Sequence, residues 1–317
     1  MAIAPSRTTA AAPRAELEPQ ERFADLGDIR LCYEDLGDPG GQPLVLVMGL
    51  GTQLIHWNPA LCNLLVDRGF RVIRFDNRDA GHSTRVDAPP PGMVPMLFGL
   101  PRGRAYDLDD MADDIAGLMD ALELESAHLM GVSMGGMIAQ VAGYRHPGRV
   151  RSLTLMMTGA GKPIASLPRL RAFGTLLAKP ARSKERFVER TLKTFEVIGS
   201  PAYPMGGERE TEFRRILELT WDRNHHSAGV ARQLHAITSS GDRTKRLGSI
   251  TAPALVIHGD SDPLVRPVAG RGLARAISGA EFRLIPGMGH DMPPELYEQF
   301  ADAVAEVAAR AASRSPR

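Results

Sequence analysis

Short runs of apolar residues alternate with helix-like segments along most of the chain. Apolar and polar residues alternate at 29–34, which predicts a half-exposed strand. Buried strands are predicted where short apolar runs stand between turn-forming residues, at 43–48, 72–75, 127–132, 153–156, 254–257 and 282–285. Amphipathic helices are predicted where apolar residues recur at helical spacing, at 107–122 and 301–312, and a further helical stretch is predicted at 136–144. This order predicts an α/β fold with a mostly parallel sheet covered by helices on both faces.

The alternation stops after Met157 and resumes only at 254–257. The sequence between them is charge-rich and helix-like, with large apolar residues at helical spacing around Leu170, Phe187 and Phe213. A helical insertion between two strands predicts a cap on the sheet. We therefore divide the chain into a flexible N-terminal tail (1–20), an α/β core (21–160 and 250–317) and a helical cap or lid (161–249).

The charge of the chain is nearly balanced, with 38 Lys and Arg against 37 Asp and Glu and a formal net charge of +1. This balance argues against a nucleic-acid-binding protein. Hydrophobic residues make up 43% and charged residues 24%, which is the composition of a globular protein and not of a disordered chain. Cys32 and Cys62 are too few for a disulfide framework, so we expect two free thiols in a reducing compartment.

Neither a secretory signal nor a transmembrane segment is expected. Residues 1–20 are rich in Ala and Pro and lack the basic start and continuous apolar stretch of a signal peptide. Residues 39–66 and 126–144 contain no Asp, Glu, Lys or Arg, but Gly, Pro and polar side chains interrupt the first, and glycines and polar side chains the second. We therefore expect a cytoplasmic protein.

The most informative motif is Gly-Val-Ser-Met-Gly at 131–135, between a predicted strand and a predicted helix. This G-x-S-x-G pattern is typical of a nucleophile elbow, where a strained serine stands on a sharp turn. Gly131 and Gly135 would avoid a collision where strand and helix cross. The helix N-terminus beneath Ser133 would present free N–H groups to an anion that forms on a bound carbonyl. Taken alone, the short pattern fits a structural turn about equally well.

A nucleophilic serine needs a histidine to take its proton and an acid to orient that histidine. After an elbow of this kind the acid is expected first along the chain and the histidine second. His290 lies in a glycine-rich loop after 282–285, whereas His258 ends a buried strand, where a structural role fits better. The loop after that strand offers Asp260 and Asp262. We favour Asp262 as the acid because it lies further into the loop, while Asp260 suits the turn itself.

Longer motifs resemble the α/β-hydrolase superfamily. They are VMGLGTQLIHW at 47–57, RVIRFDNRDAGHST at 71–84, GVSMGGMIAQ at 131–140, VIGSPAYP at 197–204, ARQLHAITSSGDR at 231–243, VIHGDSDPLVRP at 256–267 and IPGMGHDMPPEL at 285–296. Within the superfamily the chain resembles serine carboxylesterases of actinobacterial type, the group that includes aclacinomycin methylesterase and the lipase G-like enzymes. The resemblance implies an α/β-hydrolase fold with Ser133 as nucleophile, Asp262 as acid and His290 as base, which agrees with the argument from chemistry.

The oxyanion hole is expected to combine the backbone N–H of Met134 with one from the loop after Met48. The resemblance implies Leu50 as this second donor. The chain has Met48-Gly49 where the superfamily often has His-Gly. A main-chain donor does not need the missing imidazole, so the change bears on how the loop is positioned and not on the mechanism.

Together these residues predict a serine hydrolase that cleaves a small-molecule carboxylic ester, with an apolar acyl or alcohol part, through an acyl-enzyme and without a cofactor. The fold also supports other reactions, so thioester or phospholipid cleavage, perhydrolysis and C–C bond hydrolysis stay open. A non-catalytic receptor for small ligands is the alternative from another class. The complete triad argues against it, because binding alone needs no proton relay.

Three other residues are candidates for an acyl pocket. Trp57, Met48 and Met288 would either line such a pocket or pack in the core, since methionine fills irregular apolar space. Apolar residues at 93–98 would line the mouth of the pocket or pack against the cap.

Two further motifs receive structural interpretations. Residues 76–83 are expected to form a turn that supports the site. His225 and His226 are neighbours in sequence, and neighbouring side chains rarely converge on one ion, so no metal site is predicted.

The cap concentrates positive charge in one stretch. Residues 169–193 contain eight Lys or Arg and two Glu, a local charge of +6. Beside the apolar positions Leu170, Phe173 and Leu177, this charge would suit peripheral contact with an anionic lipid surface or an acidic substrate. We favour the simpler interpretation, a solvated helix face over an apolar cap core.

Overall fold

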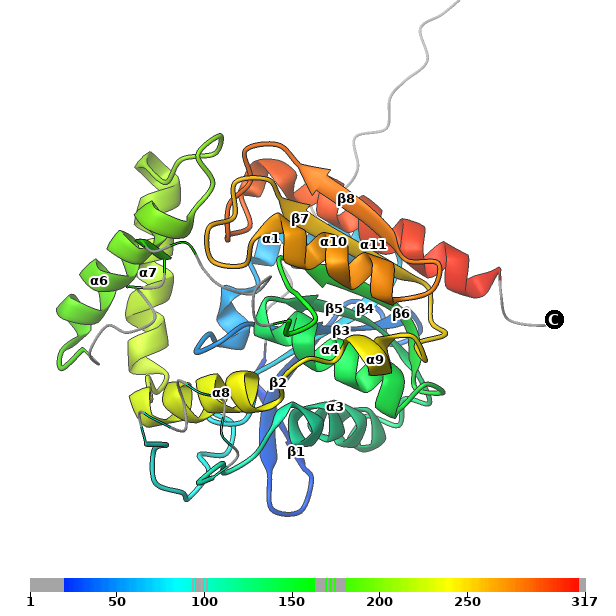
Figure 1. Cartoon of the computed structure of the whole chain (residues 1–317), viewed down its shortest axis with the longest axis horizontal. Coiled ribbons are helices and arrows are strands. Elements are labelled where there is room, and N and C mark those ends of the chain that lie inside the picture. The colour runs from blue at the N-terminus through cyan, green and yellow to red at the C-terminus, as the bar shows by residue number, and fades with distance from the viewer. Residues whose placement is uncertain are drawn as a thin grey trace, which may run out of the picture.

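The computed structural model describes residues 20–92, 94, 98, 100, 102–162, 169, 171, 172, 174 and 181–313. This part of the chain forms one eight-stranded sheet with helices on both faces (Figure 1). Its strands lie in the order β1-β2-β4-β3-β5-β6-β7-β8; β2 pairs antiparallel with β1 and β4, and the other pairs are parallel. The strands are β1 (Arg22–Asp25), β2 (Arg30–Leu36), β3 (Gln42–Val47), β4 (Phe70–Phe75), β5 (Ala127–Val132), β6 (Val150–Met156), β7 (Ala254–Gly259) and β8 (Glu281–Ile285).

Two helices cover one face of the sheet and four cover the other, within the described residues. On the first face lie α1 (Pro59–Asp67) and α11 (Tyr297–Ala312). On the second lie α3 (Leu108–Ala121), α4 (Met134–Arg145), α9 (Thr244–Leu247) and α10 (Pro267–Ala276). A short 3-10 turn, η1 (Leu54–His56), follows β3, and another, η2 (Pro294–Leu296), precedes α11.

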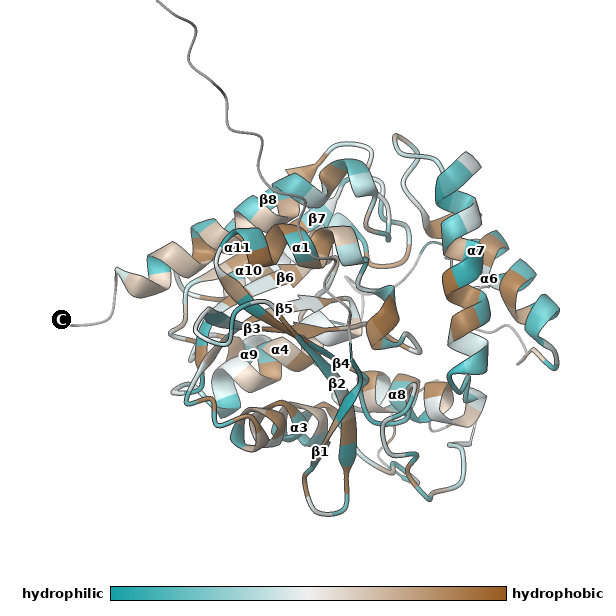
Figure 2. Cartoon of the chain, turned by 180° about the vertical axis from the view of Figure 1, so that it is seen from behind, coloured by the Kyte–Doolittle hydropathy of each residue, from teal (hydrophilic) through white to brown (hydrophobic). Residues whose placement is uncertain are grey.

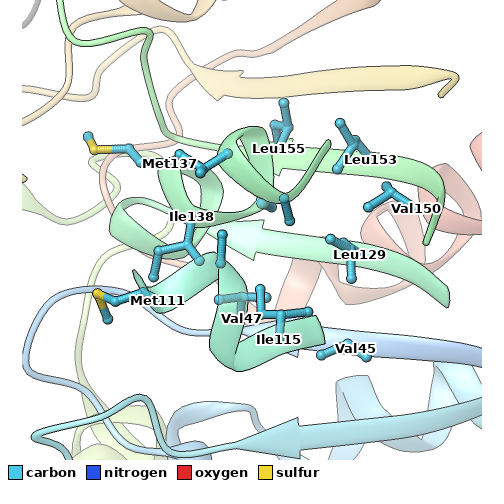
Figure 3. Packing of buried hydrophobic residues seen from close by; sticks show 14 of the residues in the cluster. Val45, Val47, Met111, Ile115, Leu129, Met137, Ile138, Val150, Leu153 and Leu155 are labelled. Carbon is cyan, nitrogen blue, oxygen red and sulfur yellow. The ribbon is translucent and has the colours of Figure 1, made fainter. Parts of the chain in front are cut away.

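A hydrophobic core lies on each face of the sheet. On the face of α3 and α4, the strand residues Val47 and Leu129 pack with the helix residues Ile115 and Ile138 (Figure 3). Burial of each such side chain contributes about 1.5–3 kcal/mol to folding. Asp107 fixes the start of α3, because its carboxylate accepts hydrogen bonds from the first N–H groups of the helix.

The cap helices α6 (Lys184–Ile198), α7 (Gly207–Asp222) and α8 (Ser227–Ser239) lie to one side of the sheet (Figure 1). Seen from behind, α6 and α7 carry both hydrophilic and hydrophobic residues (Figure 2), as expected of helices with one buried side. The chain that returns from the cap packs on the core, since Ala236 of α8 and Leu247 of α9 belong to the same cluster as β5.

The predicted α/β architecture with a mostly parallel sheet is confirmed, and each of the seven predicted strands is present. Strand β1 was not predicted. Only Ala24 of this short edge strand is buried, so the strand shows no apolar alternation in the sequence. The sequence reading also missed α1 and α10, which both begin with a proline, at Pro59 and Pro267. Proline is favoured at the first position of a helix but reads as a break elsewhere.

Some predictions fall on residues that the structure does not describe. These are the flexible tail, apart from Gln20, the helical spacing of Leu170, Phe173 and Leu177, and most of the apolar stretch 93–98. Among the described helices, none is long and apolar enough to cross a membrane.

Candidate active site

Ser133 stands on the turn between β5 and α4 with φ 55° and ψ −116°. This backbone conformation is rare outside glycine and costs about 1–3 kcal/mol. The flanking glycines leave no room for side chains: a Cβ at Gly131 would lie 2.4 Å from the carbonyl oxygen of Gly135, and one at Gly135 would lie 2.0 Å from that of Val47. Close packing on both sides therefore holds the serine in its strained conformation.

The structure brings Ser133, His290 and Asp262 into one line of hydrogen bonds. The Nε2 atom of His290 lies 3.1 Å from the hydroxyl oxygen of Ser133, and its Nδ1 atom lies 2.8 Å from Oδ2 of Asp262. The three residues come from the ends of β5, β7 and β8, which meet at one edge because these strands are parallel. This geometry can pass the serine proton to an imidazole that the carboxylate orients.

Asp262 is fully buried and held as an anion. Its Oδ1 atom accepts hydrogen bonds from the backbone N–H groups of Leu264 and Val265, each at 2.9 Å. Burial alone would raise the pKa of Asp262, but the charge and hydrogen bonds of His290 and His258 outweigh it and hold the pKa well below its usual range. The carboxylate is thus kept charged where an imidazolium would need it.

The other two candidates from the sequence lie beside this line. Asp260 is exposed, and its carboxylate accepts hydrogen bonds from the N–H of Gly287 and the hydroxyl of Ser261, both at 2.8 Å. His258 is fully buried, with Nε2 2.7 Å from the carbonyl oxygen of Val265 and 3.5 Å from Oδ2 of Asp262. Asp260 therefore joins two loops, and His258 lies beside the same carboxylate oxygen of Asp262 that His290 contacts.

The oxyanion hole was predicted to combine the backbone N–H groups of Met134 and Leu50. Met134 is the first residue of α4, so its N–H is at the positive end of the helix dipole. The loop with Gly49 and Leu50 runs along the other side: a Cβ at Gly49 would lie 3.5 Å from the Cβ of Ser133.

Side chains from three segments hold this loop in position. The amide of Asn77 donates to the carbonyl oxygen of Met48 at 3.1 Å, and the hydroxyl of Thr52 donates to that of Gly49 at 2.9 Å. From α8 in the cap, Gln233 accepts a hydrogen bond from the N–H of Gly51 at 2.9 Å. The sequence reading missed Gln233, whose only local signal is its place in the 231–243 motif.

The three candidates for an acyl pocket lie in the core. Trp57 and Met288 have no exposed surface and Met48 is 4% exposed, and all three belong to the cluster on the α1 and α11 face. In this structure the side chains pack against other apolar residues, the alternative that the sequence left open.

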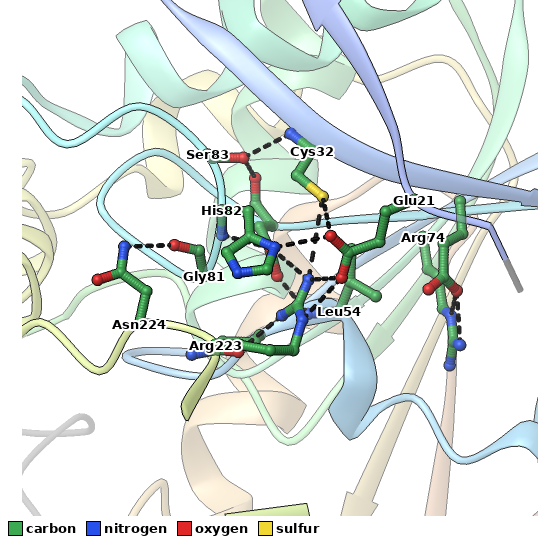
Figure 4. Close-up of polar contacts among 12 residues, drawn as sticks. Glu21, Cys32, Leu54, Arg74, Gly81, His82, Ser83, Arg223 and Asn224 are labelled. Atoms are coloured by element: carbon green, nitrogen blue, oxygen red, sulfur yellow. Dashed lines mark hydrogen bonds and ion pairs between the residues drawn. The ribbon is translucent and has the colours of Figure 1, made fainter. Parts of the chain in front are cut away.

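Residues 76–83 form a turn that links the core to the cap (Figure 4). Asp76 is fully buried and accepts hydrogen bonds from the backbone N–H groups of Leu54, at 2.7 Å, and His82, at 3.0 Å. Arg223, at the end of α7, donates to Asp76 at 3.0 Å and to Glu21 at 2.8 Å. The turn therefore supports the neighbouring loops and anchors α7.

One group of three potential metal ligands lies in this region, but its surroundings do not suit a cation. Glu21, Cys32 and His82 place one ligand atom each within 4.8 Å of one another. Arg223 already donates to Glu21, and burial raises the pKa of Cys32 far above its usual value, which disfavours the thiolate that a metal needs. His225, by contrast, packs between aromatic rings, with its centroid 4.4 Å from that of Phe187.

Residues 42–295 match the alpha/beta hydrolase fold family. The chain belongs to this family. The match contains all three residues of the Ser133–His290–Asp262 line and the loop with Leu50.

Individual relatives of this alpha/beta hydrolase differ in their reactions. Rhodomycin D methylesterase DnrP of Streptomyces peucetius is 30% identical over 87% of this chain and 94% of its own. A 2-hydroxy-6-oxononadienedioate/2-hydroxy-6-oxononatrienedioate hydrolase of Paraburkholderia xenovorans is 28% identical over 86% of this chain and 89% of its own. Among solved structures, the enol-lactonase of Burkholderia xenovorans has a TM-score of 0.68 and 26% identity, covering 92% of this chain and all of that one. These likenesses support hydrolysis as the shared chemistry.

Proposed function

We propose that this alpha/beta hydrolase is a serine carboxylesterase. The observation that carries the proposal is the line of hydrogen bonds from Ser133 through His290 to Asp262, at 3.1 and 2.8 Å. A buried carboxylate, an oriented imidazole and a serine on a strained turn are the parts that acyl transfer needs.

The proposed reaction has two steps. His290 takes the hydroxyl proton as Ser133 attacks the ester carbonyl, and the N–H groups of Leu50 and Met134 stabilise the oxyanion. The alcohol leaves as His290 returns the proton, which gives an acyl-enzyme. Water then attacks the acyl group with His290 again as base, and the acid is released. Every proton in this cycle moves through His290, and no cofactor takes part.

We propose a methyl ester, or another ester of a small alcohol, as the substrate class. The support is the likeness to rhodomycin D methylesterases, which extends over nearly the whole of both chains. Hydrolysis of a carbon–carbon bond is the second candidate, and the relative from Paraburkholderia xenovorans favours it. Both reactions would use the same serine, so substrate profiling has to separate them.

The first prediction tests the nucleophile. Ser133→Ala should lower kcat on the best ester about 10⁴-fold or more, because the triad acts as a unit, and should leave the melting temperature close to that of the wild type. The measurement is turnover of a panel of methyl, ethyl and longer-chain esters, run beside a thioester, a phospholipid and a vinylogous 1,5-diketone as C–C substrate.

Two results would count against this proposal. A purified Ser133→Ala protein that retains a tenth of the activity would mean that another group attacks the ester. Faster turnover of the diketone than of every ester would assign the site to C–C bond hydrolysis instead.

A further inference from the structure

The loop that carries His290 is hydrogen-bonded to the cap by its own backbone. The N–H of His290 donates to the carbonyl oxygen of Ile198, the last residue of α6, at 2.7 Å. At the other end of the loop, the carbonyl oxygen of Gly287 accepts a hydrogen bond from the N–H of Ala202 at 3.2 Å. The segment after α6 therefore runs directly beside the catalytic loop.

The two segments are packed too closely to admit side chains between them. A Cβ at Gly289 would lie 2.3 Å from the carbonyl oxygen of Gly199, and a Cβ at Gly287 would lie 2.2 Å from the Cβ of Ala202. Such close packing couples the two segments. Neither backbone can shift alone without a collision or a lost hydrogen bond.

Ser200 bridges the two neighbours of His290 in the chain. Its hydroxyl oxygen accepts a hydrogen bond from the N–H of Gly289 at 2.8 Å and donates to the carboxylate of Asp291. Ser200 is 3% exposed and Asp291 is 8% exposed, so water does not replace these bonds readily.

Arg209, near the start of α7, completes the contact. It donates to Oδ2 of Asp291 at 2.5 Å and to the carbonyl oxygen of Tyr203. Burial raises the pKa of Asp291. The hydrogen bonds and charge of Ser200 and Arg209 lower it in part, and His290 lowers it by a smaller amount. The cation thus compensates a buried carboxylate that the line from Ser133 to Asp262 does not use.

We propose that Ser200, Asp291 and Arg209 are positioning residues that hold the imidazole of His290 in line with Ser133 by fixing the histidine loop to the cap. The proposal rests on the proposed function, because it assigns these residues to the same proton relay. None of them contacts Ser133, so each acts through His290. A cap that moves away from the core breaks these bonds, and activity then depends on how the cap is seated.

Two variants that each lose one buried hydroxyl, one beside the histidine loop and one in β6, are compared. Ser200→Ala deletes the bridge, whereas Ser152→Ala is a matched control: Ser152 is 1% exposed and its hydroxyl bonds to His128 at 2.8 Å, near the opposite ends of the strands. Three readouts are taken below the melting temperature of every variant. They are kcat and KM on the best ester, the rate at which a fluorophosphonate labels Ser133, and the low-field proton resonance of the His290–Asp262 hydrogen bond.

Ser200→Ala should lower kcat and the labelling rate about 10- to 100-fold, with KM within about twofold, because a misplacement of about 1 Å costs that much in rate. The low-field resonance should broaden or vanish. Ser152→Ala should keep all three readouts even if it loses as much thermal stability.

Asp291→Asn tests the other end of the bridge. The amide keeps the size of the carboxylate but removes the charge that pairs with Arg209 at 2.5 Å. Asp291→Asn should lower kcat and the labelling rate in the same direction as Ser200→Ala, with KM within about twofold and a broadened low-field resonance.

The proposal is overturned if Ser200→Ala keeps wild-type kcat, labelling rate and resonance and loses only stability. Should Ser200→Ala not fold, Arg209→Lys keeps the charge but cannot hold Asp291 and Tyr203 together, and a smaller loss in the same direction is expected. A wild-type protein that neither cleaves esters nor labels would refute the proposed function instead. The His290 resonance in wild type and Ser200→Ala would then still decide whether Ser200 positions the loop.

Discussion

Two aspartates in the loop after β7 have nearly the same sequence neighbourhood and different surroundings. Asp262 has no exposed surface and meets His290, His258 and two backbone N–H groups, whereas Asp260 is exposed and joins Gly287 to its own loop. The surroundings, and not the residue type, decide which carboxylate can orient an imidazole.

We expect this difference to separate two otherwise equal substitutions. Asp262→Asn should lower kcat about 10⁴-fold, because an amide leaves His290 in the wrong tautomer. Asp260→Asn should cost less than about tenfold, since only a loop contact is weakened. Steady-state kinetics on one ester measure both, and a larger loss in Asp260→Asn would exchange the two roles.

At the scale of elements, the crossing of β3, β5 and α4 depends on positions without side chains. Gly135, in the first turn of α4, faces the carbonyl oxygen of Val47 in β3, and Gly131, in β5, faces the carbonyl oxygen of Gly135. The strained turn at Ser133 exists because the sheet and the helix are packed against it from both sides.

Gly135→Ala should therefore destabilise the protein by about 3 kcal/mol or more, since overpacking in a close crossing forces backbone to move. Gly148→Ala is the control: a Cβ there meets nothing within 4 Å, and its free energy of unfolding should stay within about 1 kcal/mol of the wild type. Denaturant unfolding gives both values. Equal midpoints for the two variants would show that the crossing tolerates a side chain.

The charged residues of the cap helix α6 are distributed differently from what the net charge of the segment suggests. Its exposed residues alternate in sign, with basic and acidic side chains about a turn apart, as in Arg186, Glu189, Lys193 and Glu196. The excess of +6 counted over 169–193 is therefore not gathered on one face of the helix that the structure describes. Such a face suits solvent, and contact with lipid stays a prediction.

At the scale of the whole molecule, polar side chains are buried in two places, one between the cap and the core and one at the ends of the strands away from the active site. In the cap, Arg232 forms an ion pair at 2.6 Å with Asp79, and both side chains are almost completely buried. Near the start of β5, at the strand ends away from the active site, His128 is 2% exposed and hydrogen-bonds to Ser152 and Gln42. Burial, with a smaller effect from Arg151, lowers the pKa of His128 to about 4.

This histidine should make stability depend on pH. Its pKa is lower in the folded protein than in the unfolded chain, where it is about 6.5, so unfolding takes up a proton below that pH. Its contribution is present above about pH 6.5 and is lost as pH falls towards about 4, by up to about 1.4 kcal/mol per pH unit.

Denaturant unfolding at several pH values between 4 and 8 checks this expectation. His128→Gln should lower the free energy of unfolding at pH 7.5, where Ser152 loses its partner, and the difference from wild type should narrow as pH falls. A difference that stays constant over this range would mean that His128 does not take up the proton on unfolding.

The sequence by itself determined the architecture and the candidate residues of this alpha/beta hydrolase. Seven strands were visible, six as short apolar runs and the one at 29–34 by alternation, and Ser133 was visible because its turn requires glycines at fixed positions. The loops with Asp262 and His290 followed from the order in which an acid and a histidine come after an elbow. Apart from that order, these signals lie within a few residues along the chain.

The tertiary structure alone decided which residues support the site. Ser200 meets Asp291 across 91 positions, and Gln233 holds the N–H of Gly51 across 182 positions. The structure also placed Trp57 in the core, whereas the sequence allowed it to line a pocket as well. No local pattern encodes such contacts, because a hydroxyl, an amide or a guanidinium has a role only after folding brings its partner within about 3 Å.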